Sequence, residues 1–106
     1  MNKIEISSGN VYADLGDNQA EEMLVKARLA LKIGEIIKQR HLTQVAAADL
    51  LGLSQPKLSG LLRGQFRGVS ETKMLECLNR LGRDVQIVIR KRSRSQAGGH
   101  TSVVFA

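Results

Sequence analysis

Residues 42–62 read LTQVAAADLLGLSQPKLSGLL, a pattern that predicts two short helices joined by a tight turn. Thr43 and Ser54 stand where each helix needs an N-cap, because a short side-chain oxygen can accept a hydrogen bond from first-turn amides. The small alanines at 47–48 let the second helix approach the first, and Gly52 can end the first helix in a left-handed conformation at little cost. Two helices that cross at about 90–120° through such a turn form a helix-turn-helix.

The second helix of this pair has an outward face whose side chains are polar or small and include no acidic group. This face carries Gln55, Pro56, Lys57, Ser59 and Gly60. A Gln amide can pair with adenine N6 and N7, and a Lys ammonium group can donate to guanine O6 and N7. Pro is accepted in a first turn, where its missing N–H removes no intrahelical bond. Gly costs about 1 kcal/mol against Ala inside a helix. The face therefore carries side chains whose hydrogen-bonding groups match those of adenine and guanine.

Apolar residues at steps of three and four predict further helices before and after this pair. Residues 19–39 form either one long helix or two with a break near residues 28–31, and Asn18 is the predicted cap. Residues 71–81 form another helix, capped by Ser70. The expected core-facing side chains include Leu24, Ala27, Leu31, Gly34 and Ile37, widened by Met23, Ala30 and Ile33, and then Val45, Leu50, Leu51, Leu58, Leu61, Met74, Leu75, Leu78 and Leu81.

Residues 84–90 change to a period of two and are rich in β-branched side chains, which predicts a β-strand. One face of this strand would carry Val85, Ile87 and Ile89. A single strand needs a partner, since its backbone hydrogen bonds go to a neighbouring strand. The partner is either the segment at residues 3–6 or the same strand of a second subunit.

The whole chain of 106 residues has the usual size of one domain. The predicted fold class is mainly α: a helix-turn-helix bundle of four to five helices with a short C-terminal β-strand. Residues 1–16 are the predicted N-terminal arm, and residues 17–90 form the helix-turn-helix domain with its terminal strand. Residues 91–106, with their arginines, serines and glycines, are the predicted flexible basic tail.

The charge of the chain indicates a polyanionic partner. The formal net charge is +6 and the isoelectric point is about 10.0. Residues 1–24 carry one basic and five acidic side chains, whereas residues 25–106 carry the other fifteen basic side chains and five acidic ones. A basic surface of this kind is typical of proteins that bind nucleic acid.

Several other classes of function are excluded by composition. One cysteine, Cys77, cannot form an intrachain disulfide and is expected to be a buried small side chain. His41 and His100 have no partners at metal-ligand spacing, so no metal or cofactor is expected. The chain has no nucleophile–base pair or phosphate-binding loop, which argues against an enzyme, and three aromatic residues are too few for RNA stacking. No apolar run approaches the roughly 18 residues needed to span a bilayer, and the first ten residues lack the apolar stretch of a signal peptide. Both observations predict a cytoplasmic protein without membrane contact.

The stretch at residues 42–64 resembles the helix-turn-helix of the xenobiotic-response-element (XRE) family, which includes the phage Cro and C-type repressors. The resemblance rests on Leu-Thr-Gln at 42–44, the alanine pair, Gly52, and Ser-Gln at 54–55. It implies a repressor-like domain that is often dimeric.

Residues 11–31 and 69–89 resemble an antitoxin branch of that family, of the HigA type. The matching segments are Ala-Asp-Leu-Gly at 13–16, Ala-Glu-Glu-Met-Leu at 20–24 and Leu-Gly-Arg-Asp-Val at 81–85. The resemblance covers about residues 8–90 and implies a chain that is sometimes encoded beside a toxin.

The resemblance also implies roles for single residues. Gln44 would hold a DNA phosphate, and the residues that follow Ser54 would face the major groove. Arg63 would reach base or backbone, and Arg67 would contact phosphate. The family often carries a larger side chain at the position of Gly60. The predicted DNA-binding residues are Gln44, Ser54, Gln55, Pro56, Lys57, Ser59, Gly60, Arg63 and Arg67.

Two functions follow as hypotheses. The first is a sequence-specific repressor, the antitoxin of a toxin–antitoxin pair, that binds a palindromic operator in double-stranded DNA as a homodimer with its recognition helix in the major groove. The second is a protein-interaction module that neutralises a partner toxin, with weak or secondary DNA binding. In that case the acidic N-terminal segment would face a basic, RNA-cleaving partner.

Overall fold

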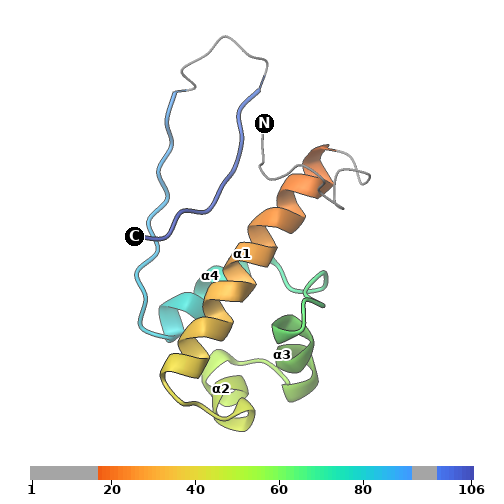
Figure 1. Cartoon of the computed structure of the whole chain (residues 1–106), viewed down its shortest axis with the longest axis vertical. Coiled ribbons are helices and arrows are strands. Elements are labelled where there is room, and N and C mark those ends of the chain that lie inside the picture. The colour runs from red at the N-terminus through yellow and green to blue at the C-terminus, as the bar shows by residue number, and fades with distance from the viewer. Residues whose placement is uncertain (1–16, 92–97) are drawn as a thin grey trace.

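Four α-helices follow one another in the computed structural model of the protein, which describes residues 17–91 and 98–106. They are α1 (Asp17–Gln39), α2 (Gln44–Leu51), α3 (Gln55–Leu62) and α4 (Glu71–Arg80) (Figure 1). α1 packs against α3 and α4, and α2 packs against the same two helices. The predicted mainly α bundle is therefore confirmed, with four helices in the described part of the chain.

The first predicted helical region is one continuous helix, so the alternative with a break near residues 28–31 is wrong. α1 starts at Asp17, which places Asn18 within the helix rather than before it. Gly34 lies in its C-terminal half, where a Cβ atom would come 3.3 Å from Leu62 Cδ2 of α3. The glycine thus lets α3 approach α1 closely, which offsets its poor helix propensity.

The core lies where α1, α3 and α4 enclose the inner side of α2. Its largest fully buried side chains are Ile33, Ile36, Leu51, Leu58, Leu61, Met74, Cys77 and Leu81. Burying each large aliphatic side chain contributes about 1.5–3 kcal/mol. Burial also raises the pKa of the Cys77 thiol, which keeps it neutral and unreactive. The prediction of a buried cysteine is confirmed.

Three side chains predicted to face the core are exposed: Leu31, Val45 and Leu50. In α1 the buried face carries Leu29 and Ile33. Leu31 is two residues from each, which is about 200° around a helix, so it points away from the core. Leu31 was therefore predicted on the wrong face of α1, whereas Ala30, Ile33 and Ile37 of the predicted stripe are buried.

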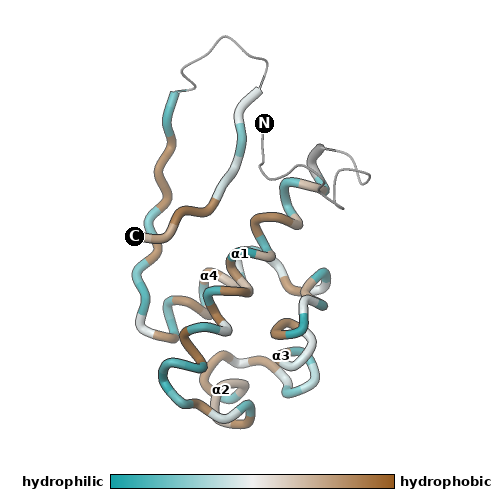
Figure 2. Tube along the Cα trace, viewed as in Figure 1, coloured by the Kyte–Doolittle hydropathy of each residue, from teal (hydrophilic) through white to brown (hydrophobic). Residues whose placement is uncertain are grey.

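The predicted β-strand at residues 84–90 does not form in the described part of the chain. Residues 83–91 leave α4 as an extended and exposed arm, which Figure 1 shows reaching away from the helices. Figure 2 shows that this arm alternates hydrophilic and hydrophobic stretches and that its last described residues are hydrophilic. A strand requires hydrogen bonds to a second strand, and no segment among residues 17–91 and 98–106 supplies them. The N-terminal arm that was one predicted partner lies outside the described residues, as do residues 92–97 of the tail.

The described end of the chain contacts α1, which the sequence analysis did not predict. The backbone N–H of Thr101 donates to Glu21 Oε1 at 3.0 Å. The Phe105 ring lies 4.5 Å from Lys32 Nζ and 5.0 Å from Arg28 Cζ, within the range of a cation–π interaction. No helix in the described part of the chain is long and apolar enough to cross a membrane.

Candidate nucleic-acid interface

The turn between α2 and α3 is built as the sequence predicts. Thr43 Oγ1 accepts a hydrogen bond from Ala46 N at 3.1 Å, and Ser54 Oγ accepts one from Lys57 N at 3.2 Å. Gly52 has a φ of +67°, the left-handed conformation, and the following Leu53 N–H donates to Ala48 O at 3.0 Å. These contacts satisfy the helix ends and fix the direction in which α3 leaves the turn.

The angle between the two helices is held by small and apolar side chains on their inner sides. Ala47 and Ala48 of α2 are buried, as are Leu58 and Leu61 of α3. These side chains pack on the core rather than facing solvent, so the opposite sides of both helices stay free. Substituting a larger residue for either alanine would push the helices apart.

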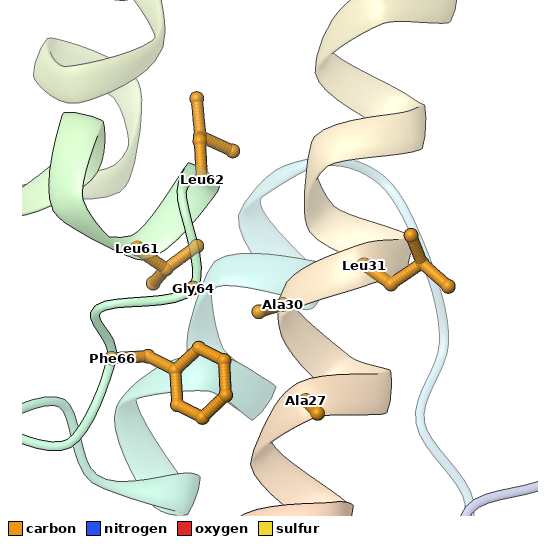
Figure 3. A pocket seen from close by; sticks show the side chains of 7 residues that line it. All are labelled: Ala27, Ala30, Leu31, Leu61, Leu62, Gly64 and Phe66. Carbon is orange, nitrogen blue, oxygen red and sulfur yellow. The ribbon is translucent and has the colours of Figure 1, made fainter.

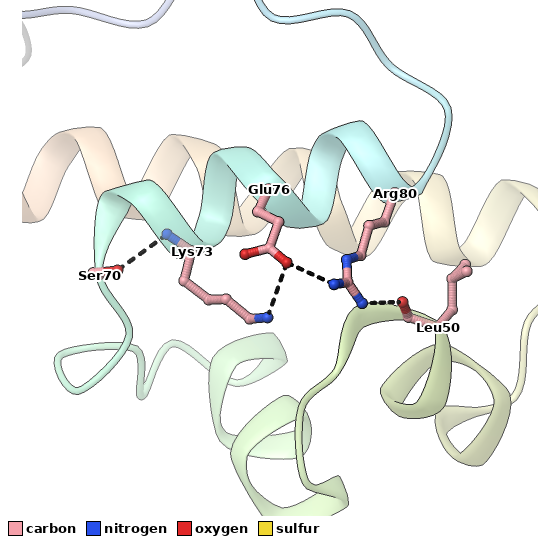
Figure 4. A network of polar contacts seen from close by, with 5 residues as sticks. All are labelled: Leu50, Ser70, Lys73, Glu76 and Arg80. Atoms are coloured by element: carbon pink, nitrogen blue, oxygen red, sulfur yellow. Dashed lines mark hydrogen bonds and ion pairs between the residues drawn. The ribbon is translucent and has the colours of Figure 1, made fainter.

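A polar network on α4 braces the end of α2 (Figure 4). Arg80 Nη1 donates to the backbone carbonyl of Leu50 at 3.2 Å, which satisfies one of the free carbonyls at the α2 C-terminus. Arg80 Nη2 also lies 2.8 Å from Glu76 Oε2, and Lys73 Nζ lies 3.6 Å from the same oxygen. The cation sits at the negative end of the α2 dipole, where it is stabilising.

The first turn of α3 is the exposed part of the motif. Ser54, Gln55, Pro56 and Lys57 are all exposed, and neither α2 nor α3 has an acidic residue in its first turn. Gln44, the first residue of α2, is exposed as well. The two positive helix ends therefore face solvent without a carboxylate to neutralise them.

The structure places two of the predicted α3 contacts away from that turn. Ser59 is half-buried, and Gly60 is buried, so the prediction that Gly60 lies on the outer face is wrong. The Gly60 carbonyl accepts a hydrogen bond from Gln65 N at 2.7 Å, because the chain after α3 folds back over it. A Cβ atom at Gly60 would meet Gln65 O at 3.4 Å, an ordinary contact distance, so glycine is not required there.

Comparison with known proteins agrees with this geometry. The sequence signature of a family described as a helix-turn-helix domain matches residues 11–90. The chain belongs to this helix-turn-helix family. A solved structure of a protein named for the XRE family of transcriptional regulators is 45% identical to the chain, with a TM-score of 0.76. The match covers 82% of this chain and 98% of that one. A search of curated proteins gave no match. The XRE resemblance is confirmed, and the HigA-type branch stays a prediction.

In this helix-turn-helix protein, the loop after α3 carries two further predicted contacts. Arg63 and Arg67 are both exposed, whereas Phe66 between them is buried against the core. With Lys57 they are three basic side chains on or just after α3. Asp49 of α2 is the exposed acidic side chain on the same pair of helices.

Lys26 of α1 fixes the position of that loop, a role that sequence reasoning missed. Only 5% of Lys26 is exposed, and its Nζ donates to the backbone carbonyl of Arg67 at 3.1 Å. The same Nζ lies 3.5 Å from Glu22 Oε2, one turn earlier in α1. The spacing of Glu22 and Lys26 was the available signal, because a Glu four residues before a Lys forms a pair on a helix face.

An apolar depression lies between α1 and the end of α3, behind the exposed turn. Figure 3 shows the Phe66 ring pointing toward α1 at the level of Ala27 and Ala30. The residues that line the depression are Ala27, Ala30, Leu31, Leu61, Leu62, Gly64 and Phe66. It contains no titratable side chain, so it offers no acid–base chemistry. Among the described residues, no group of three or more His, Cys, Asp or Glu side chains could hold a metal ion.

Proposed function

We propose that this helix-turn-helix protein is a sequence-specific DNA-binding transcriptional repressor with α3 in the major groove. The observation that carries this proposal is the exposed first turn of α3, which presents Gln55 and Lys57 beside a helix end free of acidic groups. These two side chains have the hydrogen-bonding groups that discriminate adenine and guanine. Pro56 between them has no N–H to donate, and its ring can contact a thymine methyl group.

Phosphate contacts would hold the protein in register on the duplex. Gln44 stands at the N-terminus of α2, where free amides and the helix dipole favour an anion. Arg63 at the C-terminal end of α3 and Arg67 in the following loop are exposed and would contact phosphates further along the DNA. Ser54 accepts the capping hydrogen bond, and its hydroxyl proton stays available for a phosphate oxygen.

The operator would be a palindrome read by a homodimer. Two copies related by a two-fold axis present two α3 helices, and sites on one face of the DNA lie about 34 Å apart, one helical turn. Single DNA-binding modules bury only about 600–1,000 Å² of protein surface, so pairing of two half-sites is expected to raise affinity and specificity together.

The test compares Lys57→Ala with Lys38→Ala, a matched control in which an exposed lysine near the end of α1 is removed. The operator is first located by footprinting on the promoter of the protein's own gene. Lys57→Ala should weaken operator binding by about 1–3 kcal/mol, roughly 5- to 150-fold, and should affect a random duplex much less. An equal loss on both duplexes would show that Lys57 does not read a base.

We also propose that the protein acts as the antitoxin of a toxin–antitoxin pair. The acidic balance of residues 1–24 supports this role, because it complements a basic RNA-cleaving partner. Glu21 contacts Thr101 and Glu22 contacts Lys26 within the chain, so the acidic groups left for a partner are Glu5, Asp14 and Asp17.

Co-expression with the product of the neighbouring gene tests the antitoxin role. The two proteins should purify together, and deletion of residues 1–16, which precede α1, should abolish the complex while DNA binding persists. If the product of the neighbouring gene neither binds this chain nor inhibits growth, the antitoxin role is wrong and the repressor role is unaffected.

A further inference from the structure

The arm at residues 83–91 is the least expected surface of the molecule. It carries large apolar side chains into solvent: 37% of Val85, 76% of Ile87 and 92% of Ile89 are exposed, and Val88 is exposed on the other side. Single exposed apolar residues are normal, but an extended, β-branched segment with free backbone groups is a template for pairing with another strand.

We propose that this arm pairs antiparallel with the same arm of a second copy, with Ile87 on the two-fold axis. Such an interface is self-complementary, since each residue of one copy meets the symmetric residue of the other. The proposal extends the dimeric repressor above by naming the surface that joins its two subunits.

The gradient of exposure along the arm favours the antiparallel direction. Exposure rises from Val85 through Ile87 to Ile89, because the arm moves away from its own helices. Antiparallel pairing sets Ile89 opposite the partner's Val85, close to the helices of the partner subunit, where the side chain can be covered. A two-stranded ribbon alone is marginal in water, so this contact with helices at both ends supplies stability.

The side chains also select one register. In an antiparallel pair, residues that lie directly opposite each other have side chains on the same face of the ribbon. A two-fold axis perpendicular to the ribbon must therefore pass between one residue and its own symmetric copy. With Ile87 on the axis, Val85 faces the partner's Ile89 and Ile87 faces the partner's Ile87. Asp84 then faces the partner's Arg90 twice, which pairs opposite charges. At the outermost positions Arg83 faces the partner's Lys91, and these like charges are exposed to solvent, which screens them.

The neighbouring registers lose this complementarity. With Gln86 on the axis, Ile89 faces the partner's Arg83. With Val88 on the axis, Val85 faces the partner's Lys91. Each alternative sets a charged group against an apolar one on the face that should be apolar, so the register centred on Ile87 is favoured.

The first experiment measures the mass of the full chain in solution by sedimentation equilibrium. Ile87→Glu places two carboxylates opposite each other on the axis and should raise the dimer dissociation constant by roughly 100-fold or more. The matched control is Val104→Glu, since Val104 is 79% exposed but lies in the segment after the arm. The control should remain a dimer.

The second experiment tests the register. Ile87→Cys should crosslink to its symmetric copy under mild oxidation, because opposite Cβ atoms lie about 4.5–5.5 Å apart, close to disulfide distance. Val88→Cys should crosslink much more slowly, since Val88 would face the partner's Gln86. The native Cys77 is buried, so the unsubstituted chain serves as the blank. Asp84→Arg should weaken the dimer, and adding Arg90→Asp should restore it.

A wild-type chain that sediments as a monomer, or a dimer that survives Ile87→Glu, overturns this inference. Failure here is distinguishable from failure of the proposed function. If the chain is a monomer that still prefers operator DNA through Lys57, the repressor function stands and the arm interface is wrong. If the chain forms an Ile87-dependent dimer but Lys57→Ala binds all duplexes as the wild type does, the arm interface stands and the base contact of Lys57 is wrong.

Discussion

The turn between α2 and α3 and the arm after α4 differ in where the partners of their backbone groups lie. The turn is determined by residues within a few positions of one another, such as Ser54 with the Lys57 amide and Gly52 with its left-handed φ. The arm has an equally clear pattern of β-branched residues, yet a strand requires partner groups that lie far away in the chain or on another molecule. Local hydrogen bonds therefore form within a single chain, whereas a strand forms only where a partner strand is present.

The largest expected effect is a loss of folding stability, and its dependence on protein concentration should differ between the two regions. Leu58→Ala removes a fully buried side chain of α3 and should lower the free energy of unfolding by about 2–5 kcal/mol at every concentration. Ile87→Ala should change the stability of the monomer by less than about 0.5 kcal/mol, since the side chain is exposed. Its cost should appear only as concentration rises and copies pair. Urea denaturation over a dilution series measures both, and a concentration-independent loss in Ile87→Ala would contradict the contrast.

The next largest effect tests the turn itself. Gly52→Val should destabilise the protein by about 2 kcal/mol, because a β-branched residue is strained at a φ of +67° and its Cβ would lie 3.2 Å from Arg80 Nη1. Gly52→Asn is the control, since Asn tolerates the left-handed conformation and should lose less. Thermal unfolding of the two variants gives the difference. Equal losses would mean that contact with Arg80, and not backbone conformation, determines the residue at this position.

The same contrast explains how much of the site could be predicted. The caps at Thr43 and Ser54 and the exposed face of Gln55 and Lys57 follow from residues close in sequence, and they were predicted correctly. The burial of Gly60 was not, because it depends on how the chain after α3 folds back. The structural role of Lys26 depends on a residue that is 41 positions away.

A third prediction concerns that distant contact. Arg67→Ala should weaken binding to all DNA sequences alike and lower the slope of log affinity against log salt by about 0.9, the value for one phosphate contact. Lys26→Met removes the hydrogen bond to the Arg67 carbonyl but keeps the apolar volume, so it should reproduce part of that loss. Because both act on one loop, the double variant should lose little more than Arg67→Ala alone.

Titration of operator DNA at several salt concentrations measures these effects, with Lys38→Ala as the control for loss of a lysine. Fully additive losses in the double variant would show that Lys26 does not act through Arg67. If the slope of log affinity against log salt is unchanged in Arg67→Ala, Arg67 does not contact a DNA phosphate.

The smallest effect is a gain in stability. Gly60→Ala should raise the free energy of unfolding by about 0.5–1 kcal/mol, because alanine has the better helix propensity and its Cβ meets Gln65 at ordinary contact distance. Operator affinity should stay unchanged, since the position is covered by the loop after α3 and does not face solvent. If instead the variant is more stable but binds operator more weakly, the loop must move away when DNA binds, and Gly60 would then lie against the duplex as the sequence first indicated. Thermal unfolding and DNA titration of the same sample separate the two outcomes.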